Sequence, residues 1–194
     1  MNKLEVRRQL FHLFFGIFLV VLLLYGFLDK WILLYLILIG LIISFLSKKI
    51  KIPIIHLFLK KYERPKEIKK FPGKGVITYL IGAFLATFLF SMEIAMASIL
   101  VLAFGDSISH LFGVHYGKRK HLLNDKKFVE GTIAGLFAAF IGALVFLPWY
   151  EALLAALFGM IAEVVEIKLG ADRVDDNIVI PLVAGFVVKV VRLI

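Results

Sequence analysis

The chain has 194 residues, of which 61% are hydrophobic and 19% charged, and its formal net charge is +9 at pH 7. A mean hydropathy of +0.96 excludes an ordinary soluble domain of this size, and the lack of cysteine excludes disulfides and thiolate metal sites. Because the basic residues lie beside apolar stretches, the charge predicts membrane topology and contact with anionic phospholipids, and it argues against nucleic-acid binding.

Seven apolar stretches follow one another along the chain. Several approach the roughly 20 residues that a helix needs to cross ~30 Å of hydrocarbon. We predict that residues 1–194 form a single all-α integral membrane domain, a bundle of about seven transmembrane helices. The predicted spans are residues 10–28, 31–47, 76–91, 94–112, 132–147, 150–167 and 178–194.

Basic residues gather before the first span and between the second and third spans. By the positive-inside rule these segments face the cytoplasm, so seven spans place the N-terminus in the cytoplasm and the C-terminus outside the cell membrane. In the second segment, residues 50–62 mix lysines with large apolar side chains, and Pro53 suits the first turn of a helix. This pattern predicts one amphipathic cytoplasmic helix on the inner surface, touching anionic phospholipids; a solvated loop is the alternative.

The first span opens with a polar stripe. Glu5, Arg8 and His12 are three or four residues apart and therefore share one helix face. Glu5 and Arg8 suit a simple ion pair at the membrane surface, whereas His12 lies inside the apolar run. We interpret His12 as a candidate catalytic residue, and a hydrogen-bonded structural histidine is the alternative.

A Pro-Gly-Lys-Gly segment, residues 72–75, precedes the third span. Gly73 and Gly75 leave backbone N–H groups accessible. Lys74 adds a positive charge at a helix N-terminus, where the helix dipole also favours anions. These residues predict a contact with phosphate, and a turn with a membrane-flanking lysine is the alternative.

The fourth span is interrupted by ionisable residues. Asp106 and His110 lie one turn apart on one face, and an ionisable side chain inside a span is costly and indicates function. A carboxylate here suits Mg²⁺, which binds through one or two carboxylates and substrate phosphates. We therefore predict that Asp106 is a metal ligand and a catalytic residue; a structural hydrogen bond between Asp106 and His110 is the alternative.

Between the fourth and fifth spans, residues 113–131 combine glycines with basic residues and predict a short loop that handles phosphates. The candidate nucleotide-binding residues here are Gly117, Lys118, Lys127, Glu130, Gly131 and Thr132. Glu130 at a helix start also suits the helix dipole alone. Small residues recur at every fourth position from Gly131 to Ala143, which predicts close packing and a central place for this helix in the bundle.

Carboxylates gather near the last two spans. Glu163 shares the small-residue face of the sixth span with Gly159, so we expect it to point inward as a candidate catalytic residue. A polar run before the seventh span holds Asp172, Arg173, Asp175, Asp176 and Asn177. This run predicts either a solvated turn with a helix cap or, together with Asp106, the rest of a metal–nucleotide site.

Taken in order and on one membrane side, these motifs resemble the dolichol kinase and phytol kinase family of polytopic membrane lipid kinases. The matching elements run nearly end to end: Glu5-x-Arg7-Arg8-x3-His12-x3-Gly16, Pro72-Gly73-Lys74-Gly75-x2-Thr78, Gly105-Asp106-x6-Gly113-x3-Gly117-Lys118, Lys127-x2-Glu130-Gly131-Thr132, Glu163 and Asp176-Asn177-x3-Pro181. The resemblance implies transfer of the γ-phosphoryl group of CTP, with Mg²⁺, to the hydroxyl of a polyprenol or dolichol, a phytol-like alcohol or diacylglycerol. It implies that Asp106, Asp176 and Asn177 hold metal and phosphates, and that Lys74, Lys118 and Lys127 bind the nucleotide.

Two features keep alternatives open. Phe128 follows Lys127 where family members usually carry serine or threonine, which leaves the role of Lys127 less defined. The run Asp172-Arg173-Val174-Asp175 is similar to a signature of CTP-dependent phosphatidate cytidylyltransferases, so a CDP-lipid synthase is the main alternative, with Arg173 binding the phosphate of the acceptor. A small transporter is the second alternative, although the polar residues gather at one membrane face and transporter sites lie near the midplane.

Overall fold

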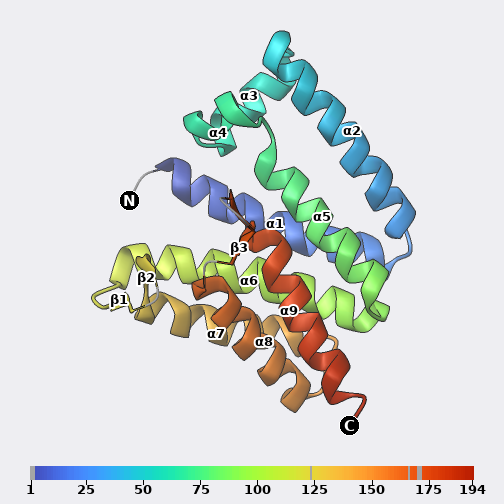
Figure 1. Cartoon of the computed structure of the whole chain (residues 1–194), viewed down its shortest axis with the longest axis vertical. Helices are drawn as coiled ribbons and strands as arrows, with labels where there is room; N and C mark the ends of the chain where they lie inside the picture. The colour runs from blue at the N-terminus through green and yellow to red at the C-terminus, as the bar shows by residue number, and fades with distance from the viewer. Residues whose placement is uncertain (1–2, 123, 166, 170–171) are drawn as a thin grey trace.

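The computed structural model describes residues 3–122, 124–165, 167–169 and 172–194, and this part of the chain is mostly helical (Figure 1). The helices are α1 (Lys3–Leu24), α2 (Lys30–Lys49), α3 (Pro53–Tyr62), α4 (Pro65–Lys70), α5 (Lys74–Leu89), α6 (Met92–Tyr116), α7 (Val129–Ala143), α8 (Trp149–Val164) and α9 (Asp176–Val191). The strands are β1 (Lys120–His121), β2 (Asn124–Phe128), β3 (Lys168–Leu169) and β4 (Asp172–Arg173). The predicted helical fold is confirmed, with two short antiparallel hairpins, β1–β2 and β3–β4, added to it.

Helix α6 is the centre of the bundle. It packs against α1, α5, α7, α8 and α9, and every residue from Ile94 to Ala103 is buried. The sequence predicted this central place for α7, because of its regularly spaced small residues, but α7 packs mainly on α6 and α8. Helix α6 takes the centre because it is apolar on all sides along this stretch, and such a helix must be covered on all sides.

Glycine allows the closest helix contacts, as the small-residue pattern predicted. A Cβ atom at Gly135 of α7 would come within 2.7 Å of the Gly105 carbonyl oxygen of α6. A Cβ atom at Gly82 of α5 would come within 2.0 Å of the Asn177 carbonyl oxygen of α9. These backbone contacts fix α7 against α6, and α5 against the start of α9.

Among the described residues, three helices, α1, α2 and α6, are long and apolar enough to cross a membrane, and α5 and α7 are shorter apolar helices. Seven spans therefore stay a prediction. Helix α1 runs from Lys3 to Leu24, so it begins and ends earlier than the predicted span of residues 10–28. The chain turns at Gly26, whose φ is 72°, and the Asp29 side chain then accepts a hydrogen bond from the Ile32 amide and caps α2.

Helices α3 and α4 follow the end of α2, and α3 packs on α1 (Figure 1). Helix α3 begins at Pro53 and ends at Tyr62, within the amphipathic helix predicted for residues 50–62. It buries Leu59 and leaves Ile54 and Leu57 exposed. The amphipathic helix is therefore confirmed, whereas its contact with a membrane surface stays a prediction.

The segment predicted as a phosphate-handling loop contains the β1–β2 hairpin. The side chain of the buried Asn124 donates to the Val164 carbonyl oxygen and accepts from the Lys126 amide. The first hydrogen bond fixes the hairpin to the end of α8, and the second holds the Asn124 side chain within β2, the strand that carries Lys127.

Candidate active site

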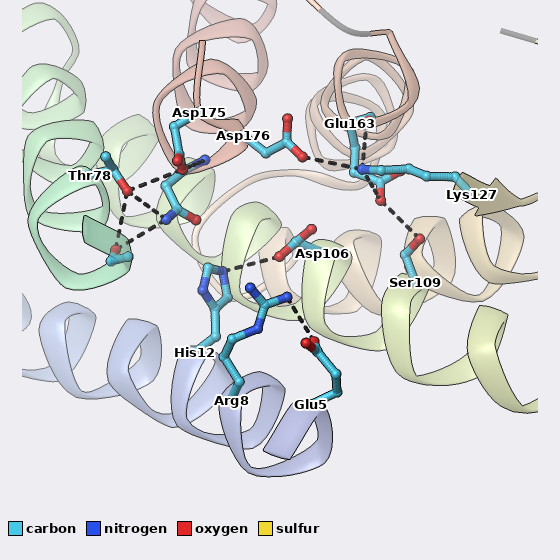
Figure 2. Close-up of polar contacts among 12 residues, drawn as sticks. Glu5, Arg8, His12, Thr78, Asp106, Ser109, Lys127, Glu163, Asp175 and Asp176 are labelled. Atoms are coloured by element: carbon cyan, nitrogen blue, oxygen red, sulfur yellow. Dashed lines mark hydrogen bonds and ion pairs between the residues drawn. The ribbon is translucent and has the colours of Figure 1, made fainter. Parts of the chain in front are cut away.

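Polar side chains from six elements meet at one end of the bundle (Figure 2). They come from the starts of α1, α5 and α9, from the later parts of α6 and α8, and from β2. The residues are Glu5, Arg8, His12, Lys74, Thr78, Asp106, Ser109, His110, Lys127, Glu163, Asp175, Asp176 and Asn177. The fold thus gathers side chains that are separated by more than 170 positions in the sequence.

Asp106 of α6 faces His12 of α1 (Figure 2). The His12 Nε2 atom lies 3.5 Å from Asp106 Oδ2, and both side chains are mostly buried. The sequence grouped Asp106 with His110, but His110 Nε2 lies 3.4 Å from Glu5 Oε2. Asp106 and His110 therefore each face a side chain of α1 and not each other, because α1 packs along this face of α6.

Glu5 is the centre of a charged network at the start of α1. Its carboxylate accepts two hydrogen bonds from Arg64, at 2.8 and 3.2 Å, and lies 3.0 Å from Arg8 Nη2. Arg64 stands between α3 and α4, so this bidentate pair ties both helices to α1. The hydrogen bond to Glu5 raises the pKa of Arg64, and the guanidinium remains charged.

Lys127 brings a largely buried cation into the middle of the site. Its Nζ atom lies 2.6 Å from Glu163 Oε1, 2.6 Å from the Glu163 carbonyl oxygen and 3.3 Å from Asp176 Oδ2. Burial alone would lower the pKa of Lys127, but the charges of Glu163, Asp106 and Asp176 together outweigh burial and raise it. The amine is therefore protonated at neutral pH.

Glu163 points inward, as predicted, and only 1% of it is exposed. Ser109 Oγ donates to Glu163 Oε1 at 3.2 Å, the same oxygen that contacts Lys127. The other oxygen, Oε2, has no hydrogen-bond partner among the described residues. These contacts hold Glu163 against the Lys127 amine, and its catalytic role stays a prediction.

The start of α9 is joined to the start of α5. Lys74 Nζ lies 2.9 Å from Asp175 Oδ2, and Thr78 Oγ1 donates to Asp175 Oδ1 at 3.1 Å. Asn177 donates through Nδ2 to Thr78 Oγ1 at 2.9 Å and to the Gly75 carbonyl oxygen at 3.2 Å. The Pro-Gly-Lys-Gly segment, residues 72–75, and the polar run before the last helix, residues 172–177, were predicted separately. The structure places them in direct contact.

Asp176 is shared between two cations. Arg173 Nη2 donates to both of its carboxylate oxygens, at 2.8 and 2.9 Å, while Lys127 contacts Oδ2. Asp175 instead caps α9 by accepting from the Asn177 amide. Asp172 belongs to β4, but its side chain lies outside the described part of the structure.

Two adjoining polar pockets open among these residues, and we call them together the polar chamber. One reaches Lys74 and the start of α9, and the other reaches Lys127 and Glu163. Both are lined by Arg8, Gln9 and Asp106, so Asp106 stands between them. A chamber that mixes cations with carboxylates suits the phosphates of a nucleotide together with a divalent metal ion.

The donor set fits Mg²⁺ held by few protein ligands. In the described part of the chain, no three histidine or acidic side chains are close enough together to hold a metal ion. Mg²⁺ does not require such a group, because it binds through one or two carboxylates, phosphates and water. Asp106 lines both polar pockets and suits this role. Asp176 already pairs with Arg173 and Lys127, and the amide nitrogen of Asn177 donates to the Gly75 carbonyl oxygen. Metal binding by Asp176 and Asn177 stays a prediction.

An amide of the Pro-Gly-Lys-Gly segment faces a carboxylate of the same chain. Gly73, with a φ of 77°, caps α5, and its N–H donates to Glu63 Oε2 at 2.8 Å. Burial raises the pKa of Glu63, and the hydrogen bond from Gly73 opposes that increase. The phosphate contact predicted for Gly73 thus has an internal competitor, while Lys74 and Gly75 line the polar chamber.

The two ends of the predicted nucleotide loop lie in different environments. Lys126 and Lys127 line the polar chamber, whereas Lys118 is exposed. Glu130 accepts hydrogen bonds from the Lys118 and Arg119 amides, at 3.1 and 3.2 Å, and so closes the base of the hairpin. Nucleotide binding by Lys118 and Glu130 stays a prediction.

Three further residues predicted to bind the nucleotide have evident structural contacts. A Cβ atom at Gly117 would come within 2.3 Å of the Gly113 carbonyl oxygen, and one at Gly131 within 2.5 Å of the Ser109 carbonyl oxygen. Thr132 Oγ1 donates to the Phe128 carbonyl oxygen at 3.4 Å. The two glycines therefore serve close packing of α6, α7 and the hairpin.

Arg64 and Tyr79 were not predicted as site residues. Arg64 is one of many basic residues in a segment predicted to face the cytoplasm, but it is the basic residue that falls between two helices that begin with proline. Tyr79 is 1% exposed, and its ring lies edge-on to His12 with centroids 4.7 Å apart. The sequence feature that could have indicated Tyr79 is its position directly after Thr78, a residue of the family motif, on a short apolar helix.

Comparison with known proteins gives three relatives. An uncharacterized protein of Methanocaldococcus jannaschii is 33% identical over 192 residues, which cover 95% of this chain and 93% of that protein. Phytol kinase 1, chloroplastic, of Arabidopsis thaliana is 28% identical over 123 residues, 56% of this chain and 40% of the kinase. CTP-dependent diacylglycerol kinase 1 of Schizosaccharomyces pombe is 27% identical over 138 residues, 62% of this chain and 61% of the kinase.

No family model and no solved structure matches the chain. The chain spans nearly the whole archaeal relative but less than two thirds of the length of either kinase. These relatives agree with the family that the motifs from Glu5 to Asn177 resemble. The chain therefore belongs to the family of membrane lipid kinases that includes the phytol kinase and the CTP-dependent diacylglycerol kinase.

Proposed function

We propose that the protein is a CTP-dependent lipid kinase that transfers the γ-phosphoryl group of CTP to the hydroxyl of a membrane-embedded alcohol. The observation that carries this proposal is the place of His12, which lines both the polar chamber and an apolar cavity between α1, α3 and α5. An alcohol whose hydrocarbon occupies the cavity would present its hydroxyl to the chamber. The printed names of the two kinase relatives support the reaction class, and one of them supports CTP.

The acceptor hydroxyl is placed next to His12, which accepts its proton, while Asp106 faces His12 across 3.5 Å. As the alcohol oxygen attacks the γ-phosphorus, its proton passes to His12. The bond from the γ-phosphorus to the bridging oxygen breaks, and that oxygen leaves with CDP. Because phosphoryl transfer depends mainly on positioning and charge stabilisation, the cations Lys127, Lys74 and Arg8 around the chamber supply much of the remaining catalysis.

Mg²⁺ is the cofactor of this proposal, with Asp106 as its main protein ligand and Asp176 and Asn177 as further candidates. When bound, it neutralises charge that builds up on the phosphate oxygens. Asp176 also keeps Arg173 and Lys127 at the chamber wall, since it contacts both. Lys118, Glu130 and the glycines of the hairpin base remain candidates for contact with the nucleotide.

We further propose that the chain crosses the cell membrane seven times, with the N-terminus and the polar chamber on the cytoplasmic side and the C-terminus outside. The basic residues in the first turns of α1 and between α2 and α5 support this orientation. They would also contact anionic phospholipids. In this arrangement α3 and α4 lie on the inner surface, next to the site.

Sidedness can be tested because the chain has no cysteine. In Lys120→Cys, the new thiol should react with a membrane-impermeant maleimide only in inverted vesicles or broken cells. Trp149→Cys, at the opposite end of the bundle, is the matched control and should react in intact cells. Labelling of Lys120→Cys in intact cells would overturn the proposed topology.

A CDP-lipid synthase is the alternative enzyme. Arg173 lines the polar chamber and is an additional cation there, which would suit an acceptor that already carries a phosphate. A small transporter is less suited, because Glu5, Lys74, Glu163 and Asp176 all stand near helix ends, whereas transporter sites lie near the midplane of the membrane.

The deciding experiment compares CTP radiolabelled at the γ-phosphorus with CTP radiolabelled at the α-phosphorus. Each is incubated with the purified protein, Mg²⁺ and a panel of lipid alcohols and phosphatidic acids. The proposal expects label in the lipid from the γ-position alone. Label from the α-position alone would identify a cytidylyltransferase, and no label from either would remove both enzyme assignments; uptake into vesicles would then test transport.

A further inference from the structure

The two pockets of the polar chamber carry opposite charges. The pocket that reaches Lys127, which we call the cationic half, has five basic side chains against two carboxylates in its described lining. Its basic residues are Arg8, Arg64, Lys126, Lys127 and Arg173. The pocket that reaches Lys74, which we call the acidic half, has only two basic side chains against four carboxylates. Its carboxylates are Glu67, Asp106, Asp175 and Asp176.

This polarity gives the two reactants different places in the chamber. A nucleoside triphosphate carries several negative charges and is attracted to the cationic half. In the acidic half, the charge of Lys74 is offset by Asp175, whose Oδ2 atom lies 2.9 Å from Lys74 Nζ. His12, next to which the acceptor hydroxyl is placed, lines this acidic half. The γ-phosphoryl group therefore has to pass from one half to the other.

Three described residues line both halves and mark their junction: Arg8, Gln9 and Asp106. Arg8 Nη2 lies 3.0 Å from Glu5 Oε2, and Asp106 Oδ2 lies 3.5 Å from His12 Nε2 (Figure 2). The Gln9 side chain makes no hydrogen bond to the described part of the chain, although only 4% of the residue is exposed. Its amide is thus the junction group that is left open to a ligand.

The place of Gln9 on α1 brings this amide to the reacting groups. Gln9 precedes His12 by three residues, so the two share one face of α1, and α1 packs on α6, which carries Asp106. Burial of an amide without a partner is unfavourable, and buried polar groups are normally satisfied. An apolar side chain would fill the same space without this penalty. The amide therefore indicates contact with a bound group.

The chemistry of an amide suits the group in transit. During phosphoryl transfer, negative charge is spread over the three equatorial oxygens of the γ-phosphoryl group. An N–H donor at the junction can contact one of these oxygens while the group passes from the cationic half to the acidic half. Because the amide is neutral, it binds the phosphate of the product less strongly than a cation would.

Resting on the kinase function proposed above, we infer that Gln9 is a further catalytic residue, whose Nε2 atom donates a hydrogen bond to an equatorial oxygen of the γ-phosphoryl group. The alcohol oxygen attacks the γ-phosphorus from the acidic half, and its proton passes to His12. The bond from the γ-phosphorus to the bridging oxygen breaks, and CDP is left in the cationic half. Gln9 transfers no proton, and its hydrogen bond strengthens in the transition state.

Gln9→Met tests this role, because methionine is similar in length to glutamine and lacks the N–H donor. The kcat for γ-phosphoryl transfer should fall about a hundredfold, with the KM for CTP within about threefold. The Tm should stay the same or rise, since a buried unpaired amide is removed. A residue that only stabilises the fold would instead lower the Tm and keep kcat.

Thr87→Val is the matched control. It also removes a polar group from an apolar helix with little change of shape, but Thr87 lies near the other end of α5 and donates to the Phe84 carbonyl oxygen. Its kcat should be unchanged. A kcat of Gln9→Met within about threefold of the unmodified protein would overturn the inference. So would a loss of Tm in Gln9→Met larger than that in Thr87→Val, or a raised KM for CTP at unchanged kcat.

Binding of a transition-state analogue gives a readout without turnover. CDP, Mg²⁺ and aluminium fluoride together imitate the phosphoryl group in transit, and the retention of radiolabelled CDP by the full protein is measured in phospholipid vesicles that contain a lipid alcohol. Gln9→Met should weaken this complex about a hundredfold and alter the binding of CDP alone by less than about threefold. Equal binding of the complex by both proteins, or no effect of aluminium fluoride on either, would overturn the inference.

The two proposals fail in distinguishable ways. If the unmodified protein transfers no γ-label to any lipid alcohol, the kinase function is removed, whatever the Gln9 variant does. If the unmodified protein and Gln9→Met both transfer γ-label at similar rates, the kinase function stays and Gln9 has no contact with the group in transit.

Discussion

The two ends of the bundle both hold charged side chains, but they pair them in different ways. At the end away from the site, Arg192 donates three hydrogen bonds to Glu151, at 2.8 to 3.1 Å, and reaches Glu93 at 3.4 Å. At the site end, His12 Nε2 and Glu163 Oε2 are buried without a hydrogen-bond partner among the described residues. One end is thus a closed ionic contact, and the other lines a chamber with groups that remain to be satisfied.

This difference distinguishes charges that satisfy one another from charges that face the polar chamber. Buried polar atoms are normally satisfied, and those that are not indicate a place where a ligand or solvent completes them. Arg192 and Glu151 join α9 to α8 and satisfy each other, so their presence in apolar helices needs no substrate. Asp106 and His12 face a chamber, and their proposed partner is the acceptor hydroxyl.

The largest effect should follow from Asp106→Asn. The amide keeps the size of the side chain but removes the charge that faces His12 and the proposed metal, so γ-phosphoryl transfer should fall roughly a thousandfold or more. Insertion and purification should remain normal. Turnover is measured with γ-labelled CTP at saturating Mg²⁺.

Glu93→Gln is the matched control at the other end of the bundle. It also removes one acidic charge from α6, but the Glu93 side chain is 64% exposed and contacts Arg192 only at 3.4 Å. Its activity should stay within about twofold of the unmodified protein, since exposed ion pairs contribute little. Near-normal turnover of Asp106→Asn would remove the catalytic and metal assignment.

Local patterns were sufficient to predict the helices, the inward direction of Glu163 and the gathering of polar residues from several helices. They did not predict which residues would pair. Asp106 was grouped with His110 because helical spacing shows neighbours on one helix, whereas the pairing with His12 depends on how α1 crosses α6. In the same way, Arg64 and Glu5 are 59 positions apart, and no local spacing links them. The β1–β2 hairpin was missed because its strands are short and rich in lysine.

An intermediate effect is expected for Lys127→Gln. The substitution removes the cation that contacts Glu163 and Asp176 and lines the polar chamber. Loss of a charge-assisted phosphate contact costs about 1.5–3 kcal/mol, so kcat/KM for CTP should fall on the order of ten- to a hundredfold. Steady-state kinetics with CTP as the varied substrate measure this.

Lys120→Gln and Lys118→Gln complete the comparison within the same hairpin. Both side chains are exposed, and Lys120→Gln should change kcat/KM by less than about threefold. Lys118→Gln shows whether the nucleotide also reaches the base of the hairpin: a tenfold loss would include Lys118 in the site. Equal, small effects at all three lysines would reduce the hairpin to a topology signal.

The smallest effect on activity, and a clear effect on stability, is expected for Arg192→Gln. The substitution leaves Glu151, whose side chain is 4% exposed, buried without its guanidinium partner. Such a loss costs about 1–3 kcal/mol, and it should lower the Tm of the purified protein by several degrees, roughly 2–4 °C per kcal/mol. Adding Glu151→Gln should recover part of that loss, because the unpaired buried charge is then gone. At a temperature where the variant stays folded, turnover should remain within about twofold, since Arg192 lies at the opposite end of α9 from Asp176. A large loss of turnover with an unchanged Tm would mean that both ends of the bundle serve the reaction, and the distinction between a closed ionic contact and an open site would fail.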